Sequence, residues 1–171
     1  VMKETSHFLP VSADLGQRVS QLVTPVSCAV IPNVVDTDLF YFQEKRYNPD
    51  QVFLFIHVSG MSTQKNPEGL LRAFAAAYSE DSQIRLLMLG NRDDSLLRFA
   101  ETFGLPAGTI RFGREVSYPE VAREMQQADA LVLFSNMENA PCVISEALCC
   151  GLPVIATETG GIPEMINDKN G

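Results

Sequence analysis

Five short apolar runs, each separated from the next by an amphipathic stretch, constrain the fold of this chain more than any other feature of its sequence. The runs lie at residues 52–58, 84–89, 109–112, 130–134 and 153–156. They are apolar almost throughout, which predicts strands that are covered on both faces, as in a parallel sheet. With a helix between successive runs, the sequence predicts an α/β fold, a Rossmann-like doubly wound parallel sheet with right-handed crossovers.

The predicted helices have clear starts. Pro67 suits the first turn of one helix, Asp94 precedes a second helix that Gly104 closes, and Ser117 with Glu120 forms the capping box of a third. In such a sheet, ligands gather on the loops that follow the strands. The candidate loops are residues 59–66, 90–94, 113–117, 135–140 and 157–160.

The acidic composition limits the classes of partner. With 171 residues the chain is one domain in size, and its net charge is −8. Nucleic acid is excluded as a partner because phosphate backbones select clustered Lys and Arg. No apolar run approaches the ~20 residues that span a bilayer, and no signal peptide is visible. The sequence therefore predicts a cytoplasmic protein.

The cysteines predict neither a metal site nor a disulfide. Cys28, Cys142, Cys149 and Cys150 include no C-x2-C pair and have no histidine at ligand spacing. Cys149 and Cys150 lie at the apolar end of a predicted helix. We expect both to pack as small hydrophobic side chains in a reducing compartment.

Between Ser135 and Glu164, two acids flank a predicted helix start. Glu138 lies in a loop, Pro141 suits the first helical position, and Glu146 lies inside the helix. A helical rise of ~1.5 Å per residue would separate the acids by about 12 Å, too far to flank one scissile bond. The helix N–H groups between them suit a phosphate. The spacing fits a nucleotide sugar, and it fits equally a solvated loop acid and an exposed helix acid.

The same stretch resembles a known family signature. Its pattern S-x-x-E-x7-E-A-x3-G-x-P-V, followed by G-G-x-P-E, is similar to that of the retaining glycosyltransferases of the GT-B fold. That group includes the sucrose, glycogen and lipopolysaccharide glycosyltransferases. The matching residues are Ser135, Glu138, Glu146, Ala147, Gly151, Pro153, Val154, Gly160, Gly161, Pro163 and Glu164.

This resemblance implies a donor site and a reaction. The family transfers a sugar from a nucleotide-diphosphate sugar to an acceptor, without a metal or other cofactor. The first acid, Glu138, would contact the donor sugar and the second, Glu146, the ribose. Backbone amides of the intervening loop would contact the sugar and the diphosphate. That loop contains Asn139, Ala140, Pro141, Cys142 and Val143.

The loop at residues 59–66 resembles the family's diphosphate loop. Gly60 would let the donor approach the backbone, and Lys65 would hold the diphosphate, so Glu138 and Lys65 are the predicted catalytic residues. The resemblance places Met61 where an arginine is usual, and Asn66 where a glycine is usual. One of two expected cations is therefore absent from this loop.

The resemblance extends to two further loops. It places Val116 near the nucleotide base. Gly90 and Asn91 resemble a turn of the family, and they either line the ribose and base side or only permit a tight turn. His57 lies within an apolar strand, and we expect a hydrogen-bonded core residue there rather than a catalytic base.

The resemblance also implies a domain organisation. Residues 1–30 would end an acceptor-binding domain and cross between domains, and residues 31–171 would form a donor-binding domain without its last helices. The D-x-D at Asp36 and Asp38 is interpreted as a turn before the anchor Phe40, not as a metal site. A fragment of this kind is expected to bind donor weakly and to transfer no sugar. In the full-length protein, the acceptor would be a sugar or a lipid-linked sugar, with peripheral membrane contact.

Other functional classes stay open. The same fold serves nucleotide-sugar epimerases and phosphorylases, but the acid–base residues of the former and the pyridoxal phosphate lysine of the latter are not visible. A catalytically inert nucleotide-binding module is favoured by the absent arginine and opposed by the two acids. The expected product is a polysaccharide, lipopolysaccharide or glycolipid.

Overall fold

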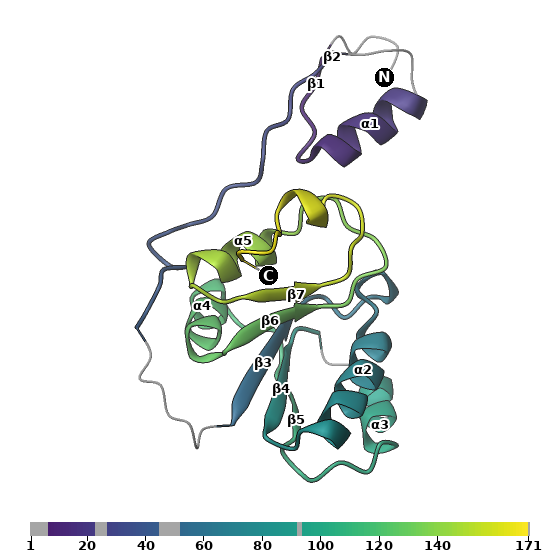
Figure 1. Ribbon diagram of the computed structural model, residues 1–171, viewed down its shortest axis with the longest axis vertical. Helices are drawn as coiled ribbons and strands as arrows, with labels where there is room; N and C mark the ends of the chain where they lie inside the picture. The colour runs from purple at the N-terminus through teal and green to yellow at the C-terminus, as the bar shows by residue number, and fades with distance from the viewer. Residues whose placement is uncertain (1–6, 23–26, 45–51, 92–93, 171) are drawn as a thin grey trace.

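The computed structural model describes residues 7–22, 27–44, 52–91 and 94–170. Its centre is a five-stranded parallel sheet in the order β5-β4-β3-β6-β7 (Figure 1). The strands are β3 (Phe53–Val58), β4 (Ile84–Leu89), β5 (Ile110–Phe112), β6 (Ala130–Leu133) and β7 (Val154–Ala156). Each lies within a predicted apolar run, so the predicted α/β fold with a parallel sheet is confirmed.

Helices cover both faces of this sheet. One face carries α2 (Pro67–Glu80) and α3 (Asp94–Glu101), and the other carries α4 (Tyr118–Gln127) and α5 (Cys142–Cys149) (Figure 1). Two short 3₁₀ turns, η2 (Thr63–Lys65) and η3 (Ile162–Glu164), follow β3 and β7. Each face of the sheet has its own apolar cluster, one with α2 and α3 and one with α4 and α5. The region from β3 to η3 is called the sheet domain below.

The helix starts largely follow the sequence signals. Asn66 caps α2 by accepting the Gly69 N–H at 3.1 Å. The capping box of α4 is confirmed, because the Glu120 carboxylate accepts the Ser117 N–H at 2.9 Å. The prediction for Pro141 was wrong by one residue: its extended ψ of 117° makes it the N-cap of α5, and the helix begins at Cys142.

The strand order creates a switch point next to β3. From β3 the chain runs outward through β4 to β5, then returns through α4 to place β6 on the other side of β3. The loops that leave β3 and β6 therefore lead to helices on opposite faces of the sheet, and this place is called the switch point below. Ligands of open α/β sheets bind outside the carboxyl ends of the strands at such a point.

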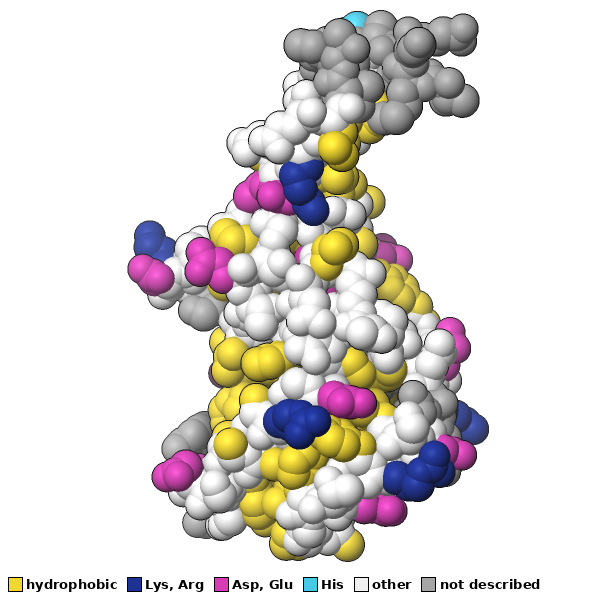
Figure 2. All heavy atoms as spheres, turned by 90° about the vertical axis from the view of Figure 1, so that its right-hand side faces the viewer, with side chains coloured by type: hydrophobic (Ala, Val, Ile, Leu, Met, Phe, Trp, Pro, Cys, Tyr) yellow, Lys and Arg dark blue, Asp and Glu magenta, His cyan; other side chains and the backbone are white. Residues whose placement is uncertain are grey.

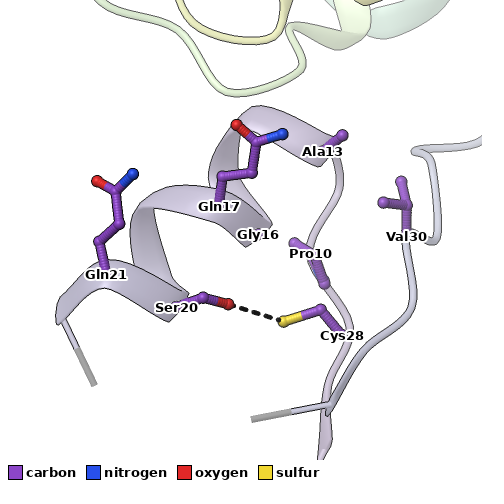
Figure 3. A pocket seen from close by; sticks show the side chains of 8 residues that line it. All are labelled: Pro10, Ala13, Gly16, Gln17, Ser20, Gln21, Cys28 and Val30. Atoms are coloured by element: carbon purple, nitrogen blue, oxygen red, sulfur yellow. Dashed lines mark hydrogen bonds between the residues drawn. The ribbon is translucent and has the colours of Figure 1, made fainter. Parts of the chain in front are cut away.

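A small N-terminal unit precedes the sheet domain. It consists of β1 (His7–Phe8), α1 (Ala13–Leu22) and β2 (Ser27–Cys28), with β1 and β2 paired in parallel. The Ser12 hydroxyl caps α1 by accepting the Leu15 N–H at 3.2 Å. Buried Gly16 lets α1 lie close to Pro10. Between α1 and the strands lies an open groove of about 510 Å³ (Figure 3).

Three side chains connect the N-terminal side to the sheet domain. The Glu164 carboxylate accepts the Ala13 and Asp14 N–H groups at 2.8 and 2.7 Å, so it caps α1 from far along the chain. Arg18 donates to Asn139 Oδ1 at 3.0 Å, and Asn33 donates to the Ala140 carbonyl at 2.8 Å. In Figure 2 the N-terminal region stands as a narrow projection above the sheet domain.

The other surface features are simple. On the α2–α3 side, acidic and basic side chains are interspersed among hydrophobic ones (Figure 2). The D-x-D forms a turn, in which Asp36 Oδ1 accepts the Asp38 N–H at 3.0 Å and Phe40 behind it is fully buried. No helix in the described part of the chain combines the length and the apolar character needed to cross a bilayer.

Candidate functional site

An ion pair lies at the switch point next to β3. Lys65, at the end of η2, places its Nζ 2.5 Å from Glu138 Oε1, in the loop after β6. The same carboxylate oxygen accepts the Ser135 hydroxyl at 2.7 Å. Glu138 is only 5% exposed, so the alternative of a solvated loop acid is wrong. Burial of this acid requires its partners, because an unpaired carboxylate is costly to remove from water.

The two loops that carry this pair are also bound to each other. The Asn136 N–H donates to the Gln64 carbonyl at 2.8 Å, and the Gln64 side chain donates to the Met137 carbonyl at 3.0 Å. The Asn136 side chain donates to the Thr63 carbonyl at 3.1 Å. Lys65 and Glu138 are therefore held by their backbones as well as by their charges.

The second acid is also buried and paired. Glu146, on α5, is 6% exposed and accepts the Tyr118 hydroxyl at 2.6 Å. The alternative of an exposed helix acid is therefore wrong as well. Burial raises the pKa of Glu146, and the bond from Tyr118 partly opposes this. Partial burial and that bond raise the pKa of Tyr118. The Tyr118 ring packs edge-on against Phe40, with ring centroids 4.8 Å apart.

A pocket of about 240 Å³ lies at the carboxyl ends of β3 and β4, and it brings together three predicted donor residues. Gly60, Asn91 and Val116 all line it, although they come from three different loops. The remaining lining residues are Val58, Ser59, Leu89, Gly90, Glu115 and Val121. Its walls combine apolar side chains with backbone groups, which suits a planar heterocycle.

Two glycines permit close approaches around the site. A Cβ on Gly90 would lie 1.7 Å from the Ser59 carbonyl oxygen, so the loops after β3 and β4 touch there. A Cβ on Gly160, whose φ is +55°, would lie 1.8 Å from the Glu138 carbonyl oxygen. Gly90 therefore both permits a tight contact and lines the pocket.

The predicted donor loop lies between the two acids. Asn139 is exposed, with its side chain bound to Arg18, and the Ala140 carbonyl accepts from Asn33. Pro141 is buried, Cys142 begins α5 at the surface, and Val143 packs against the α4–α5 cluster. Whether their backbone amides meet a ligand stays a prediction.

The structure defines the surroundings of His57, which lies in β3, and of Met61, which lies in the loop after β3. His57 is fully buried, and its ring bonds Val132 and Ser59, so the prediction of a hydrogen-bonded core residue is confirmed. Burial lowers its pKa. Met61 packs its side chain against the α2–α3 cluster, so this side chain belongs to the core on that face of the sheet.

Sequence reasoning did not identify Tyr118 or Arg18. Tyr118 is the first residue of α4, and no local pattern ties it to an acid on another helix. Arg18 lies in α1, and only the tertiary fold brings it to the loop after β6. In the described part of the chain, no cluster of three or more His, Cys, Asp or Glu side chains could hold a metal ion.

This arrangement offers three kinds of contact along one edge of the sheet. A buried carboxylate can accept sugar hydroxyls, an ammonium group beside it can hold an anion, and a second carboxylate with an apolar pocket can hold a further polar and planar group.

Comparison with known proteins points in one direction. The model of the family described as glycosyl transferases group 1 matches residues 41–171. The chain is 26% identical over 164 residues to N-acetyl-alpha-D-glucosaminyl L-malate synthase of Bacillus anthracis, covering 91% of this chain and 42% of that protein. The chain thus spans less than half the length of this relative.

Solved structures share the fold. HepE from Anabaena, in complex with UDP and glucose, superposes with a TM-score of 0.77 at 21% identity, over 95% of this chain and 47% of that chain. The pneumococcal O-GlcNAc transferase GtfA, in complex with UDP and GlcNAc, superposes with a TM-score of 0.78 at 19% identity, over 99% of this chain and 34% of that chain.

Proposed function

This chain belongs to the glycosyl transferases group 1 family, and we propose that it forms the site that binds the nucleotide-diphosphate sugar donor of such an enzyme. Residues 31–171 would be the donor-binding domain. Residues 1–30 would contain the end of an acceptor-binding domain and the crossing between the two. The donor would lie along the carboxyl edge of the sheet, from the Lys65–Glu138 pair to the pocket that Val116 lines.

The observation that carries this proposal is the Lys65–Glu138 pair at the switch point, with its nitrogen and oxygen 2.5 Å apart. In a nucleotide sugar, the glycosidic oxygen joins the sugar directly to the diphosphate. A site for this ligand needs a sugar-binding acceptor and an anion-binding cation as immediate neighbours. Glu138 and Lys65 meet this requirement, and the buried site strengthens both contacts.

The nucleotide half would use the second acid and the pocket. Glu146 accepts one bond from Tyr118 and keeps acceptor capacity for ribose hydroxyls. The base would enter the pocket of Gly60, Asn91 and Val116. The UDP complexes of two proteins that share this fold support a nucleoside diphosphate as the group bound here.

The chemical step would be transfer of the sugar to a hydroxyl of the acceptor. The bond from the anomeric carbon to the diphosphate oxygen breaks, and its electron pair leaves with the diphosphate. The acceptor oxygen bonds to the same carbon and gives up its proton to the departing phosphate. Lys65 and the N-terminus of α5 would stabilise the developing negative charge. Retention of configuration rests on the resemblance of the two-acid signature to retaining enzymes.

The remaining parts of the function concern the whole protein. The acceptor would be a sugar or a lipid-linked sugar held by a preceding domain, in polysaccharide, lipopolysaccharide or glycolipid synthesis. The enzyme would work in the cytoplasm without a metal, at the membrane surface where its acceptor is lipid-linked. The isolated chain would bind donor and transfer no sugar.

Calorimetric titration tests the proposal. UDP, GDP, ADP, CMP and the corresponding nucleotide sugars are titrated into the wild-type chain. The same titrations are then repeated on the variants Lys65→Ala and Glu146→Gln. Lys169→Ala and Glu101→Gln serve as matched controls, because both residues are exposed and belong neither to the ion pair nor to the pocket lining. We expect one nucleotide class to bind, and both site variants to weaken binding about tenfold or more, or ~1.4 kcal/mol.

Two results would contradict the proposal. If the site variants and the controls bound the nucleotide equally well, its binding site would lie elsewhere. If no nucleotide bound at millimolar concentration, the proposed donor site would be wrong. Assay of the full-length protein separates the alternatives: donor binding without transfer to any acceptor would favour the catalytically inert module.

A further inference from the structure

The backbone pairing of β3 with its two neighbours ends at different places. With β4, β3 stays in register up to Val58 and Leu89, but with β6 the register ends at Ile56 and Leu131. The next residue of β3, His57, is therefore paired with β4 but not with β6. This is the only histidine in the sheet domain among the described residues, and it is 0% exposed.

At this point a side chain of β3 contacts the backbone of β6. Leu131 and Leu133 make their backbone bonds toward β7, so the Val132 carbonyl between them faces β3. It lies 2.9 Å from His57 Nδ1. A carbonyl oxygen only accepts, so Nδ1 carries the proton and Nε2 is the acceptor nitrogen of the ring. The imidazole thus joins β3 to β6 through a side chain, just beyond the last paired residues of the two strands.

The other ring nitrogen controls the loop that leaves β3. His57 Nε2 lies 2.8 Å from the Ser59 hydroxyl, which must then donate its proton to the ring. The Ser59 oxygen in turn accepts the Met61 N–H at 3.0 Å. Met61 has a φ of +53°, an uncommon conformation for a side chain other than glycine. This bond helps to hold it there, at the entrance to the turn that ends in Lys65.

These contacts join those of the candidate site to form a closed circuit. It runs from the Val132 carbonyl through His57 and Ser59 to the loop of Lys65. It then crosses the ion pair to Glu138 and returns to the end of β6 through the Ser135 hydroxyl. Every member belongs to β3, β6 or the loop that follows one of them.

We propose that His57 is the positioning residue of the Lys65–Glu138 site. Its ring joins β6 to the loop after β3, sets the path of that loop, and so fixes where Lys65 meets Glu138. Because His57 is fully buried, it acts through this loop and not by contact with the donor. The role rests on the proposed function, because the position of the pair matters to catalysis only if the pair binds the donor.

Three variants and one control test this role. His57→Phe removes both ring nitrogens at similar volume, His57→Gln keeps one donor and one acceptor, and Ser59→Ala breaks the circuit in the middle without touching the core. Thr109→Val is the control. Thr109 is also buried, at 1% exposure, but it lies just before β5, at the opposite end of the sheet.

Amide hydrogen exchange gives a readout that needs no ligand. The Lys65 and Asn136 amides, which donate to Ser62 and Gln64, report on the two loops. We expect exchange at both to be about tenfold faster in His57→Phe and Ser59→Ala, while His57→Gln and Thr109→Val stay near the wild-type rates. If folded Ser59→Ala and His57→Phe exchanged at the control rates, the role would be overturned.

Binding of UDP and UDP-glucose gives the second readout. We expect the dissociation constant to rise about tenfold in His57→Phe, and to rise no further when Ser59→Ala is added, because both changes break one circuit. If the losses of affinity from His57→Phe and Ser59→Ala added up in the double variant, the two residues would not act in one circuit. If wild-type protein bound neither probe, the proposed donor site would fail for these nucleotides, and exchange would still decide whether His57 positions the pair.

Discussion

The N-terminal unit and the sheet domain are held by different kinds of contact. In the sheet domain, strand residues such as Ile56, Leu86 and Leu131 are 0% exposed, and helices cover both faces. In the N-terminal unit, Leu22 of α1 is 86% exposed and Leu9 is 61% exposed. The open groove of Figure 3 shows the same lack of a closed core.

The difference shows where each region takes its stability. The sheet domain is stabilised by apolar burial of its own, which grows with the number of enclosed side chains. The N-terminal unit depends on polar contacts with the sheet domain, namely the cap from Glu164 and the bond from Arg18 to Asn139. We therefore expect core substitutions to act on the whole chain, and substitutions at these contacts to act on α1 alone.

The largest expected effect comes from the core. Leu131→Ala removes a fully buried side chain from β6 and should lower the free energy of unfolding by about 2–5 kcal/mol, because it leaves a cavity. Leu22→Ala in the N-terminal unit should change it by less than about 0.5 kcal/mol. Urea unfolding followed by circular dichroism measures both. Equal losses would mean that both regions share one core.

The next effect is a pH dependence confined to the sheet domain. Burial lowers the pKa of His57 from its ordinary value of 6.5. Between the lowered pKa and pH 6.5 the unfolded chain therefore binds more protons than the folded chain. The free energy of unfolding falls as the pH drops through this window. The slope for one proton is at most about 1.4 kcal/mol per pH unit. Lys65 and Glu138 are the charged groups that act on His57, in opposite directions.

Glu146 should oppose this trend. Its pKa is raised by burial, so acidification through the raised value favours the folded state. Urea midpoints measured between pH 7.5 and 5 should therefore fall in the wild type and fall more steeply in Glu146→Gln. His57→Phe should flatten the dependence. An unchanged slope in His57→Phe would assign the acid sensitivity to other groups.

The cap on α1 should give a smaller and local effect. Glu164→Gln removes a charge from the N-terminus of α1 and should destabilise that helix by about 1 kcal/mol. Amide exchange of Ala13 and Asp14 should quicken while strand amides keep their rates. Global unfolding of the sheet domain by this change would erase the distinction between the two regions.

The smallest effect is expected at Arg18. Arg18→Gln should cost about 0.5 kcal/mol or less, because the side chain is 41% exposed and solvent screens its contacts. Faster exchange at Asn139 should be the main change. Arg72→Gln is a fitting control, since its pair with Glu68 is exposed and 3.8 Å long. Equal exchange at Asn139 in both variants would show that Arg18 does not hold the loop.

The strands and the fold class could be predicted from the sequence because buried parallel strands leave a continuous apolar signature. Helix starts at Pro67 and Ser117 were equally visible, since their signals are local. The start at Pro141 was off by one residue, because proline serves both as an N-cap and in the first turn, and sequence alone does not set its ψ angle. Predictions for residues 92–93, which include Asp93, lie outside the described residues.

The candidate site was predicted as separate residues and became a site only in three dimensions. Glu138 and Lys65 were both identified, yet nothing in their separation along the chain indicated that they pair. Tyr118 and Glu146 meet across two helices in the same way. His57 was recognised as a core residue, but its place where β3 and β6 part depends on the strand order.

The sequence by itself determined the repeating strands and helices, the parallel sheet and the loops on which the acids lie, because each of these follows from residues close together in the chain. Only the tertiary structure decided which loops meet. The return of the chain to place β6 beside β3 brings Lys65 to Glu138 and sets His57 beneath both. Contacts between distant segments depend on how the elements pack, and no local pattern records that packing.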